Sequence, residues 1–472
     1  MKEGKIWKKF EELRKKYNCF IFDDYKIIQE DNDTIEITFY FEIFGLKKFK
    51  PIIKISKLDI DFDKINTKTL KAIAFNMGMI ELISYWKATC PKRILIECGK
   101  LTQEQIDWFK KIYYNGLSEF RYINHIEKIP MDELFQIECN CRPEYANTSR
   151  YNETSMEYKG ALIPVGGGKD SCVTLELLKE HKKDNLCLVI GDKAPQLKEI
   201  KKAGYKDDQI IHIKRTIDKR LLELNEKGFL NGHTPFSAML AFTSYFVAYL
   251  SGKKYIAVSN EQSSNESNIK GEKINHQYSK SFEFEEEFRW YINNYLEDHV
   301  QYFSMLRPLN ELQIAELFSN MKKYHKIFRS CNIGSKETPW KWCCNCSKCL
   351  FVFIILSPYL YKKKLVKIFK KDLYENKDLL NIFIELCGYG EVKPFECVGT
   401  PEEVNYAISR TIKQLETEGK ELPYLLNYYK ENYKLVDTNS DIEKRYNEEN
   451  NVPKEFEKLL KDLIFNDENE KI

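Results

Sequence analysis

The first third of the chain combines a strand-like alternation of hydrophobic and polar residues with helical patterns. Within residues 35–55, the segments IEITFYFEIFG and FKPIIKI alternate in the manner of strands with one buried face, and they are rich in aromatic and β-branched residues. Residues 75–86 and 103–114 have helical patterns, and residues 93–97 form a short apolar run between them. We therefore expect an N-terminal α+β domain over residues 1–150.

Short apolar runs alternate with helix-like segments in the middle of the chain. Residues 161–165, 186–190, 209–213 and 255–259 form these runs. That order indicates parallel βαβ units, because parallel strands need helical crossovers. The sequence therefore predicts an α/β fold whose catalytic core, a parallel sheet with helices, spans residues 155–365.

The last hundred residues are highly charged and helical in pattern. We expect residues 366–472 to form a helical C-terminal extension, and the part from Asp437 onward, which has few large apolar residues, to be loosely held. The polar stretch 142–159 is the expected linker between the first domain and the core.

Composition narrows the classes of partner. The 74 Lys and Arg residues nearly balance the 71 Asp and Glu residues, so a net charge of +3 indicates no surface dedicated to nucleic acid or to a membrane. Residues 1–9 lack the apolar core of a signal peptide, and the uncharged stretches 235–250 and 350–361 are shorter than the roughly 20 residues of a spanning helix. We interpret both stretches as buried helices and expect a cytoplasmic protein.

The segment ALIPVGGGKDS, residues 161–171, has the order of a strand, a phosphate-binding turn and a helix. Glycines let the backbone approach an anion, and the N–H groups of a starting helix point at it. A kinase-type loop is excluded because Lys169 is followed by Asp170, and a dinucleotide fingerprint is excluded because Ser171 replaces the third glycine. The structural alternative is a simple tight turn.

Polar residues follow the other predicted strands. In a parallel sheet the ligand binds beyond the carboxyl ends of the strands. Residues 191–193, 214–215 and 260–264 stand at these ends, and among them we take Asn260 and Glu261 as nucleotide-binding candidates. Loops are commonly polar, so any one of these residues could instead be an ordinary surface residue that contacts no ligand.

The spacing of four cysteines predicts a metal site. Cys343, Cys346 and Cys349 form C-x-x-C-x-x-C, and Cys331 lies 12 positions ahead, so four thiolates could surround one tetrahedral ion, with zinc the first choice. Cys344 is left over. The alternatives are an iron–sulfur cluster, or cysteines that serve only as small core residues.

Two polar segments, residues 231–235 and 275–281, gather donors, acceptors and candidate bases. They contain His233, His276 and Lys280. A lone histidine is more commonly a surface or capping residue, but the clustering favours function. The acidic run over residues 283–287 is expected to be a solvated helix face.

The glycine loop resembles the S-G-G-x-D-S signature of the PP-loop ATP pyrophosphatases, which cleave ATP between its α and β phosphates. Gly166 stands where the family has its first serine, while Gly167, Gly168, Asp170 and Ser171 match. The resemblance implies an adenine nucleotide alpha-hydrolase-like core. PP-loop enzymes that make 7-cyano-7-deazaguanine also have a comparable four-cysteine zinc site.

Six segments together resemble one family within this group, the MurL-type UDP-N-acetylmuramoyl-L-alanyl-L-glutamate epimerases. They are VGGGKDS, NGHTP, SNEQSSNE, NHQYSKSFEFE, CNCSKCLFVF and KPFECVGT. The resemblance implies an enzyme of peptidoglycan precursor synthesis, acting on a nucleotide-sugar peptide. It would use ATP and Mg²⁺ to adenylylate the terminal L-glutamate and invert its α carbon, releasing AMP and pyrophosphate.

The resemblance also implies roles for individual residues. Asp170 would hold magnesium, Lys169 would balance charge on the leaving pyrophosphate, and the phosphates would contact Gly166, Gly167, Gly168 and Ser171. Lys280 and Arg289 would bind anionic groups of the substrate. The candidates for the proton-transferring base are His276, His233 and Cys331.

Two alternatives stay open at the level of sequence. One is another adenylating PP-loop enzyme, such as a 7-cyano-7-deazaguanine synthase or a thiolating or amidating ligase, although the additional N-terminal domain and C-terminal extension disfavour the synthase. The other is a nucleotide-sensing protein without turnover, which the run Lys169, Asp170 and Ser171 disfavours.

Overall fold

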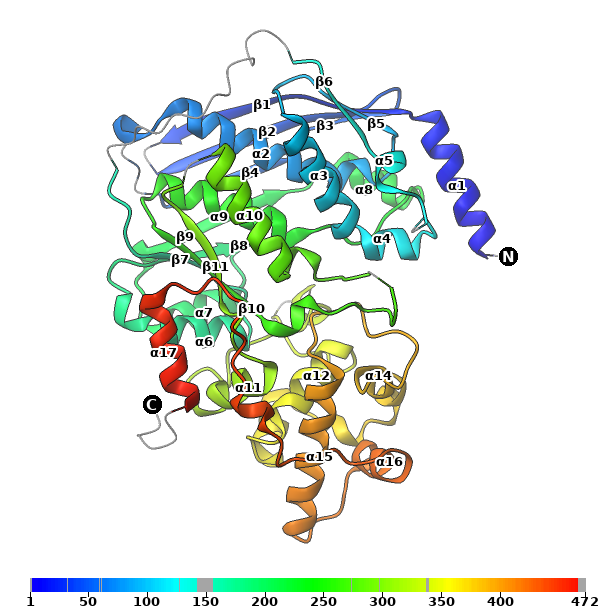
Figure 1. Cartoon of the computed structure of the whole chain (residues 1–472), viewed down its shortest axis with the longest axis vertical. Helices are drawn as coiled ribbons and strands as arrows, with labels where there is room; N and C mark the ends of the chain where they lie inside the picture. The colour runs from blue at the N-terminus through cyan, green and yellow to red at the C-terminus, as the bar shows by residue number, and fades with distance from the viewer. Residues whose placement is uncertain are drawn as a thin grey trace.

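One mixed sheet runs through the molecule (Figure 1). The structure is a computed structural model that describes residues 2–31, 33–58, 60, 62–126, 128–141, 156–272, 274–296, 298–336 and 339–465. Within these residues, eleven strands pair in the order β11-β10-β7-β8-β9-β4-β2-β1-β5-β6, with β3 joined to β2 beside that path. The strands are β1 Cys19–Asp31, β2 Thr34–Ile43, β3 Lys47–Phe49, β4 Ile52–Ser56, β5 Arg93–Ile96, β6 Gln136–Cys139, β7 Ala161–Pro164, β8 Leu186–Ile190, β9 Ile210–Thr216, β10 Tyr255–Glu261 and β11 Gln301–Leu306.

Helices cover both faces of this sheet and form a separate layer at one end of the molecule (Figure 1). They are α1 Lys2–Lys16, α2 Thr67–Trp86, α3 Gln103–Gly116, α4 Ser118–Ile123, α5 Met131–Leu134, α6 Lys169–Leu177, α7 Ala194–Ala203, α8 Lys219–Glu226, α9 Phe236–Leu250, α10 Phe282–Tyr295, α11 Glu311–Asn320, α12 Ser347–Leu356, α13 Lys362–Phe369, α14 Leu380–Leu386, α15 Pro401–Thr417, α16 Tyr424–Asn432 and α17 Lys454–Phe465.

The alternating N-terminal segment forms antiparallel strands, as its pattern predicts. β2 pairs with both β1 and β4, and its alternate side chains Ile35, Ile37 and Phe39 are fully buried. The predicted helices are α2 and α3, and the short apolar run between them is β5. The long strand β1 was not among the predicted elements.

The sheet continues across the domain boundary expected near residue 150. β4 pairs antiparallel with β9, which puts Ile53 opposite Arg215 and Ile55 opposite Ile213. Residues 142–155 of the expected linker lie outside the described residues. The N-terminal strands and the parallel strands are therefore parts of one hydrogen-bonded sheet.

The same pairing corrects one predicted strand end. We expected the third core strand to end at Ile213 and to expose Lys214 and Arg215, but β9 extends to Thr216 because β4 supplies hydrogen-bond partners. Arg215 turns instead to α2, where its Nη2 lies 2.7 Å from Oε1 of the buried Glu81. Arg215 is thus held in a structural ion pair, whereas Lys214 is exposed on the extended strand.

Strands β7 to β11 form the parallel part of the sheet, as expected for βαβ units. Alternate residues divide between its two faces. Leu162 and Leu188 belong to the apolar core that includes α9, while Ile163 and Val189 belong to the core that includes α12. Both faces are covered, so the carboxyl ends of the strands are the positions left for a ligand.

The two uncharged stretches are buried helices. Residues 235–250 correspond to α9, and residues 350–361 hold the second part of α12, which ends earlier than expected, at Leu356. Helices α12, α14, α15 and α16 form the layer at the lower end of Figure 1. In the described part of the chain, no helix has the length and apolar character needed to cross a membrane.

The C-terminal segment is held more firmly than its composition suggested. Ile442, Val452 and Phe456 are buried, and the ring of Phe456 stacks on Phe303 of β11 with centroids 5.9 Å apart. A few apolar residues at the right positions are enough to dock α17 against the sheet. The expectation of a loosely held segment from Asp437 is therefore wrong as far as residue 465.

Candidate active site

The glycine loop connects β7 to α6 in the predicted order of strand, turn and helix. Gly167 has φ +91°, a left-handed conformation that side chains with a Cβ rarely adopt. Gly168 caps α6 without a side chain, so the first N–H groups of the helix stay available to an anion. The backbone of the loop therefore uses glycine where the conformation at Gly167 and the helix cap at Gly168 favour it.

One side of this loop is covered and the other is open. The backbone N–H of Arg329 donates to the carbonyl of Gly167 at 2.7 Å, and a Cβ on Gly168 would lie 2.7 Å from Oγ of Ser330. A Cβ on Gly166 would meet no atom within 4 Å. The loop is therefore braced by the segment that precedes Cys331, and its free side lies at Gly166.

Ser171 is engaged inside the fold. Its hydroxyl donates to Oε2 of Glu199 on α7 at 2.9 Å and accepts from the N–H of Gly168 at 3.2 Å. Burial raises the pKa of Glu199 well above its usual range. In the described conformation, Ser171 fastens the loop to α7.

Lys169, Asp170, Glu261 and Glu311 form a charged cluster at the carboxyl ends of the strands. The ammonium of Lys169 is buried and ion-paired with Asp170 and with Glu311, the first residue of α11. Burial would lower the pKa of Lys169, but these two carboxylates raise it. Burial raises the pKa of Glu311, and the negative charges of Asp170 and Glu261 raise it further against the effect of Lys169.

Glu311 was not predicted, because its partners are distant in sequence. Only its position at the start of a helix after an apolar strand could have suggested it. The other two acidic members were predicted. Burial would raise the pKa of Asp170, but Lys169, Lys348 and Lys280 together lower it, so this carboxylate is ionised.

Asn260 and Glu261 are the last residues of β10, and they lie beside a fully buried arginine. Nδ2 of Asn260 donates to Oγ of Ser304 at 3.1 Å, and the carbonyl of Glu261 accepts from Nη1 of Arg307 at 2.7 Å. Arg307 also donates to the carbonyl of Lys280. This arginine, which the sequence did not single out, holds the end of β10 and the Lys280 segment together.

The same arginine corrects the expectation for the acidic run. Glu285 is fully buried on α10, and its Oε2 lies 3.3 Å from Nη2 of Arg307. Glu283 and Glu287 face Lys111 of α3. The run is therefore only partly a solvated face: Glu283 and Glu286 are exposed, whereas Glu285 is buried against Arg307.

Cys397 lies among positive charges. Nζ of Lys280 donates to its Sγ at 3.0 Å, and Nζ of Lys348 contacts its carbonyl. Burial alone would raise the pKa of the Cys397 thiol, but Lys280, a hydrogen bond with His276 and the charge of Lys348 lower it to about 6. The thiol is therefore largely ionised at neutral pH.

His276 contacts two groups that determine its protonation. Its Nδ1 pairs with Oε2 of Glu119, a residue of α4. Burial would lower the pKa of His276, but hydrogen bonds with Cys397 and Glu119 raise it to about 9. The nearby ring of His233 has its centroid 4.2 Å from that of His276, and burial together with the charge of His276 lowers the pKa of His233 to about 3.

We call Glu119, His233, His276, Lys280 and Cys397 the acid–base cluster. Glu119, His233 and His276 also place ligand-type atoms within 4.8 Å of one another. Glu119 and His276 already satisfy each other as an ionic hydrogen bond. The predicted His233, His276 and Lys280 are brought together here, whereas Cys397 and Glu119 were missed. KPFECVGT was recognised as a segment, but nothing local marked its cysteine.

A single asparagine fastens the two segments of the acid–base cluster. Oδ1 of Asn268 accepts from the N–H of His276 at 2.8 Å, and Nδ2 of Asn268 donates to the carbonyl of Pro394 at 2.9 Å. The N–H of Lys393 returns a hydrogen bond to the carbonyl of Asn268 at 2.8 Å. These bonds fix the chain around Cys397 relative to His276.

Arg289 does not join these groups. Its Nη1 donates to the carbonyl of Tyr302 at 2.7 Å, near the amino end of β11 and away from the strand ends that carry the charged cluster. We therefore drop Arg289 as a candidate for binding the substrate and keep Lys280.

The four cysteines predicted from spacing meet in the fold as the four-cysteine cluster. The Sγ atoms of Cys331, Cys343, Cys346 and Cys349 all lie within 4.8 Å of one another, with Cys331–Cys346 at 4.0 Å and Cys343–Cys349 at 3.7 Å. Tetrahedral zinc with sulfur ligands at about 2.3 Å requires sulfur separations near 3.8 Å. The described donor set therefore fits zinc.

The structure also shows the surroundings of Cys344, which the spacing left without a role, and of Cys331, which was a candidate both for the metal site and for the base. Cys344 has φ +57°, and its Sγ donates to the carbonyl of Phe369 at 3.1 Å. The Sγ of Cys331 accepts from the N–H of Gly334 at 3.1 Å within the four-cysteine cluster. Cys331 is therefore a member of the four-cysteine cluster and is not part of the acid–base cluster.

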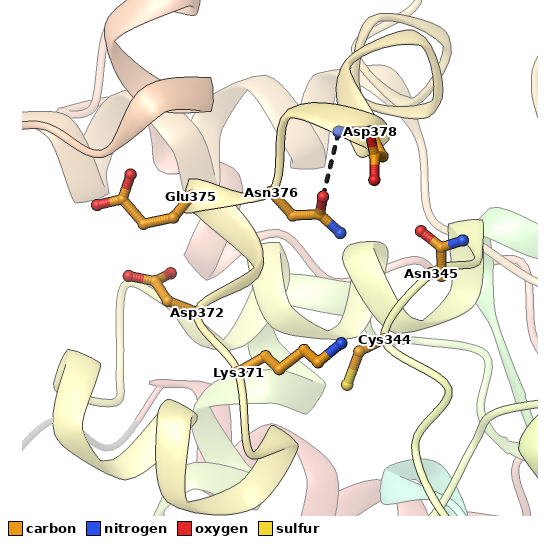
Figure 2. A pocket seen from close by; sticks show the side chains of 7 residues that line it. All are labelled: Cys344, Asn345, Lys371, Asp372, Glu375, Asn376 and Asp378. Atoms are coloured by element: carbon orange, nitrogen blue, oxygen red, sulfur yellow. Dashed lines mark hydrogen bonds between the residues drawn. The ribbon is translucent and has the colours of Figure 1, made fainter.

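An open pocket lies beside the four-cysteine cluster but outside the candidate active site. Figure 2 shows its lining side chains, which come from the turn at Cys344 and from residues 371–378. Several of them have local structural partners: Oδ1 of Asn376 accepts from the N–H of Asp378 at 3.1 Å, and Asp372 pairs with Lys362 at 2.8 Å. None of the lining residues belongs to the glycine loop, the charged cluster or the acid–base cluster.

Comparison with known proteins identifies relatives along most of the chain. Two family models match, the MurL N-terminal domain over residues 11–305 and the MurL C-terminal domain over residues 327–438. These models divide the chain after β11, whereas we expected boundaries near residues 150 and 365. No solved structure matches the chain significantly.

Three curated relatives carry the same name, UDP-N-acetyl-alpha-D-muramoyl-L-alanyl-L-glutamate epimerase. The protein from Xanthomonas oryzae pv. oryzae is 32% identical over 71% of this chain and 73% of its own length. The Micromonospora protein is 29% identical over 86% of this chain and 89% of its own length, and the Salinispora tropica protein is 30% identical over 84% and 86%.

Proposed function

The chain belongs to the MurL family, and we propose that it is an epimerase that uses ATP to invert the terminal L-glutamate of UDP-N-acetylmuramoyl-L-alanyl-L-glutamate. The observation that carries the proposal is the meeting of two kinds of group at one edge of the sheet. The glycine loop offers helix N–H groups to phosphates, and the acid–base cluster offers proton-transferring groups. Inversion of an activated carboxylate needs both.

Activation explains why an epimerase would consume ATP. Loss of the α proton from a free carboxylate would place a second negative charge on the same centre. Attack of the carboxylate on the α phosphorus of ATP, with loss of pyrophosphate, converts it to an acyl adenylate without that charge. The α proton then becomes acidic enough for a side-chain base, and hydrolysis after inversion releases the D-glutamate product and AMP.

Different residues would bind the phosphates, balance the charge on pyrophosphate and bind the substrate. The N–H groups at the start of α6 would bind phosphate oxygens, and Lys169 would balance the charge that develops on the departing pyrophosphate. Lys280 and Lys348 extend positive charge toward the position of Asp170 and would bind the anionic substrate. The PP-loop assignment is part of this proposal.

The site also suits magnesium. Asp170, Glu261 and Glu311 bring three carboxylates together, and their mutual repulsion contributes to the raised pKa of Glu311. Hard oxygen ligands of this kind fit a magnesium ion, which would neutralise phosphate charge. Zinc in the four-cysteine cluster would be structural, because all four ligand positions are taken by protein sulfur.

Turnover in deuterium oxide tests the proposed function. The purified protein with ATP, Mg²⁺ and UDP-N-acetylmuramoyl-L-alanyl-L-glutamate should form AMP and pyrophosphate and should place solvent deuterium on the α carbon of the glutamate residue. No exchange is expected without ATP or with an α,β-methylene ATP analogue. Formation of ADP and phosphate, or AMP formation with a wholly L and unlabelled product, would contradict the proposal.

A further inference from the structure

We propose that the thiolate of Cys397 is the base that removes the α proton, and that Glu119 and His276 position it in a carboxylate–imidazole–thiolate triad. This inference rests on the proposed function and deepens it, because it names the group that breaks the carbon–hydrogen bond. None of the three residues is close to another in sequence, and Cys397 lies outside the four-cysteine cluster.

The geometry has the order of contacts that an activated thiol requires. Glu119 pairs with Nδ1 of His276, and the imidazole of His276 is close enough to the Cys397 thiol to lower its pKa. In such an arrangement the carboxylate orients the imidazole, and the imidazole holds the sulfur charge. Nζ of Lys280, 3.0 Å from the Sγ, adds a second positive charge.

The position of Cys397 connects this triad to the nucleotide side of the site. Lys280 contacts Cys397 and also lowers the pKa of Asp170, next to the glycine loop. The far side of the Cys397 segment is fixed by Glu403, whose Oε1 accepts from the N–H of Glu311 at 2.7 Å. A glutamate activated beside Asp170 would therefore present its α carbon near the sulfur.

The proposed step is a proton transfer. The lone pair of the thiolate forms a bond to the α hydrogen, and the electrons of the broken carbon–hydrogen bond move into the acyl carbonyl to give an enolate. Cys397 becomes a neutral thiol, and the imidazolium of His276 and the ammonium of Lys280 remain nearby as positive charges. A water molecule then gives a proton to the opposite face of the α carbon, which completes the inversion, and the hydroxide that remains takes the proton from the Cys397 thiol, which restores the thiolate and water.

The same triad gives the N-terminal region a role. Glu119 is the first acidic residue of α4, and Oγ of the neighbouring Ser118 donates to the carbonyl of Asn275 at 3.1 Å. Tyr122 on the same helix lies against Phe395, with ring centroids 5.8 Å apart. Helix α4 thus touches both segments that hold the triad, so the N-terminal part of the chain completes the site.

The central test separates activation from proton transfer. In Cys397→Ser the side chain keeps its size but loses an ionisable thiol, so solvent deuterium exchange at the α carbon should fall by about 10²–10⁴-fold. Substrate-dependent exchange of labelled pyrophosphate into ATP, which reports adenylylation, should change by less than about threefold. Cys139→Ser, at the end of β6, is the matched control and should leave both rates unchanged.

The reactivity of Cys397 in the unmodified protein provides a test that does not depend on whether a variant folds. Iodoacetamide should alkylate Cys397 far faster than Cys139 near pH 7, and the substrate with ATP should slow this reaction selectively. Peptide mass spectrometry gives both rates. Cys397 reactivity no greater than that of Cys139 would overturn the proposal.

A third variant tests the positioning residue. Glu119→Gln keeps the shape of the side chain but removes its charge, so the acidic limb of the kcat/KM profile should move to higher pH, a change that loss of packing alone would not cause. An unmoved limb would remove Glu119 from the triad.

Other outcomes identify other roles. Wild-type exchange in Cys397→Ser, with the unmodified enzyme active, would overturn this inference and leave the proposed function intact. A substrate-mass adduct on Cys397 would make it a nucleophile in place of a base. A second equivalent of tightly bound metal, lost in His233→Asn, would replace the triad by a metal site. If the unmodified enzyme makes no AMP and exchanges no proton, the proposed function itself fails.

Discussion

The four-cysteine cluster and Cys397 use the same side chain in opposite environments. In the cluster each thiol has sulfur neighbours, with Cys343 and Cys349 3.7 Å apart, and within the described residues no lysine ammonium donates a hydrogen bond to these sulfurs. Cys397 has the ammonium of Lys280 at 3.0 Å and the imidazole of His276 as neighbours. The first environment suits a soft metal ion, and the second stabilises a free thiolate.

The chemistry of a cysteine in this protein therefore depends on its neighbours and not on the residue type alone. This difference also separates stability from chemistry. Loss of a cluster thiol should affect the fold, whereas loss of the Cys397 thiol should affect turnover.

The largest expected effect is a loss of stability when a cysteine of the four-cysteine cluster is replaced. Cys346→Ser removes one of four thiolates just before α12, whose side chains from Cys349 to Leu356 are fully buried in the apolar core. The loss of bound metal should cost more than about 4 kcal/mol of unfolding free energy, so the variant should be largely insoluble or melt at a much lower temperature. Metal analysis and thermal melts give the result. The same melting temperature and metal content as the unmodified protein would show that the cluster is not a metal site.

The next effect should come from the charged cluster. Asp170→Ala removes the ionised carboxylate beside Lys169, and AMP formation should fall by about 10²–10³-fold because the phosphates lose their metal-bridged contact. Melting temperature should change little compared with Cys346→Ser. Asp132→Ala, which removes an exposed carboxylate paired with Lys110, is the control. Similar rates in both variants would remove Asp170 from the site.

The pH profile of kcat/KM should follow the ionisation of Cys397 and His276 in the acid–base cluster. Cys397 must be deprotonated, so kcat/KM should fall as the pH drops below about 6, and His276 must be protonated, so it should fall again above about 9. In His276→Asn the thiol loses a hydrogen bond and a charge, so the acidic limb should move up toward the ordinary thiol value of about 8.5. An acidic limb that stays near 6 in this variant would show that His276 does not control the thiolate.

A smaller effect should distinguish the two basic residues once proposed for substrate binding. Lys280→Met removes the charge beside Cys397 and Asp170, and it should lower kcat/KM by about 10- to 100-fold. Arg289→Met should leave kcat/KM within about twofold, because Arg289 donates to the carbonyl of Tyr302. Equal losses in the two variants would argue against this assignment.

The smallest effect should follow Gly166→Ser. A Cβ at this position meets no atom within 4 Å, and the residue is not in a left-handed conformation, so stability should change by less than about 0.5 kcal/mol. The matched variant Gly168→Ser places its Cβ 2.7 Å from Oγ of Ser330 and should be clearly less stable. Denaturant titration compares the two. Equal stabilities would mean that the loop is not braced by residues 329–330.

Much of the fold could be predicted because its signals are local. The period-two pattern of residues 35–55 and the strand–turn–helix order around Gly167 follow from contacts within a few residues. The strand end at Ile213 was wrong because the extension of β9 depends on β4, more than 150 residues earlier in the chain. The ion-pair partners of the acidic run were missed for the same reason, since Arg307 and Lys111 lie on other elements.

The sequence by itself determined the glycine loop, the four cysteines and the α/β order of the core, because each depends on the spacing of neighbouring residues. Only the tertiary structure joined the N-terminal strands to the parallel strands and brought Glu119, His276 and Cys397 together. It also decided the protonation of these groups. The physical reason is that a pKa depends on burial and on charges within a few ångströms, and the folded chain supplies those neighbours from distant positions.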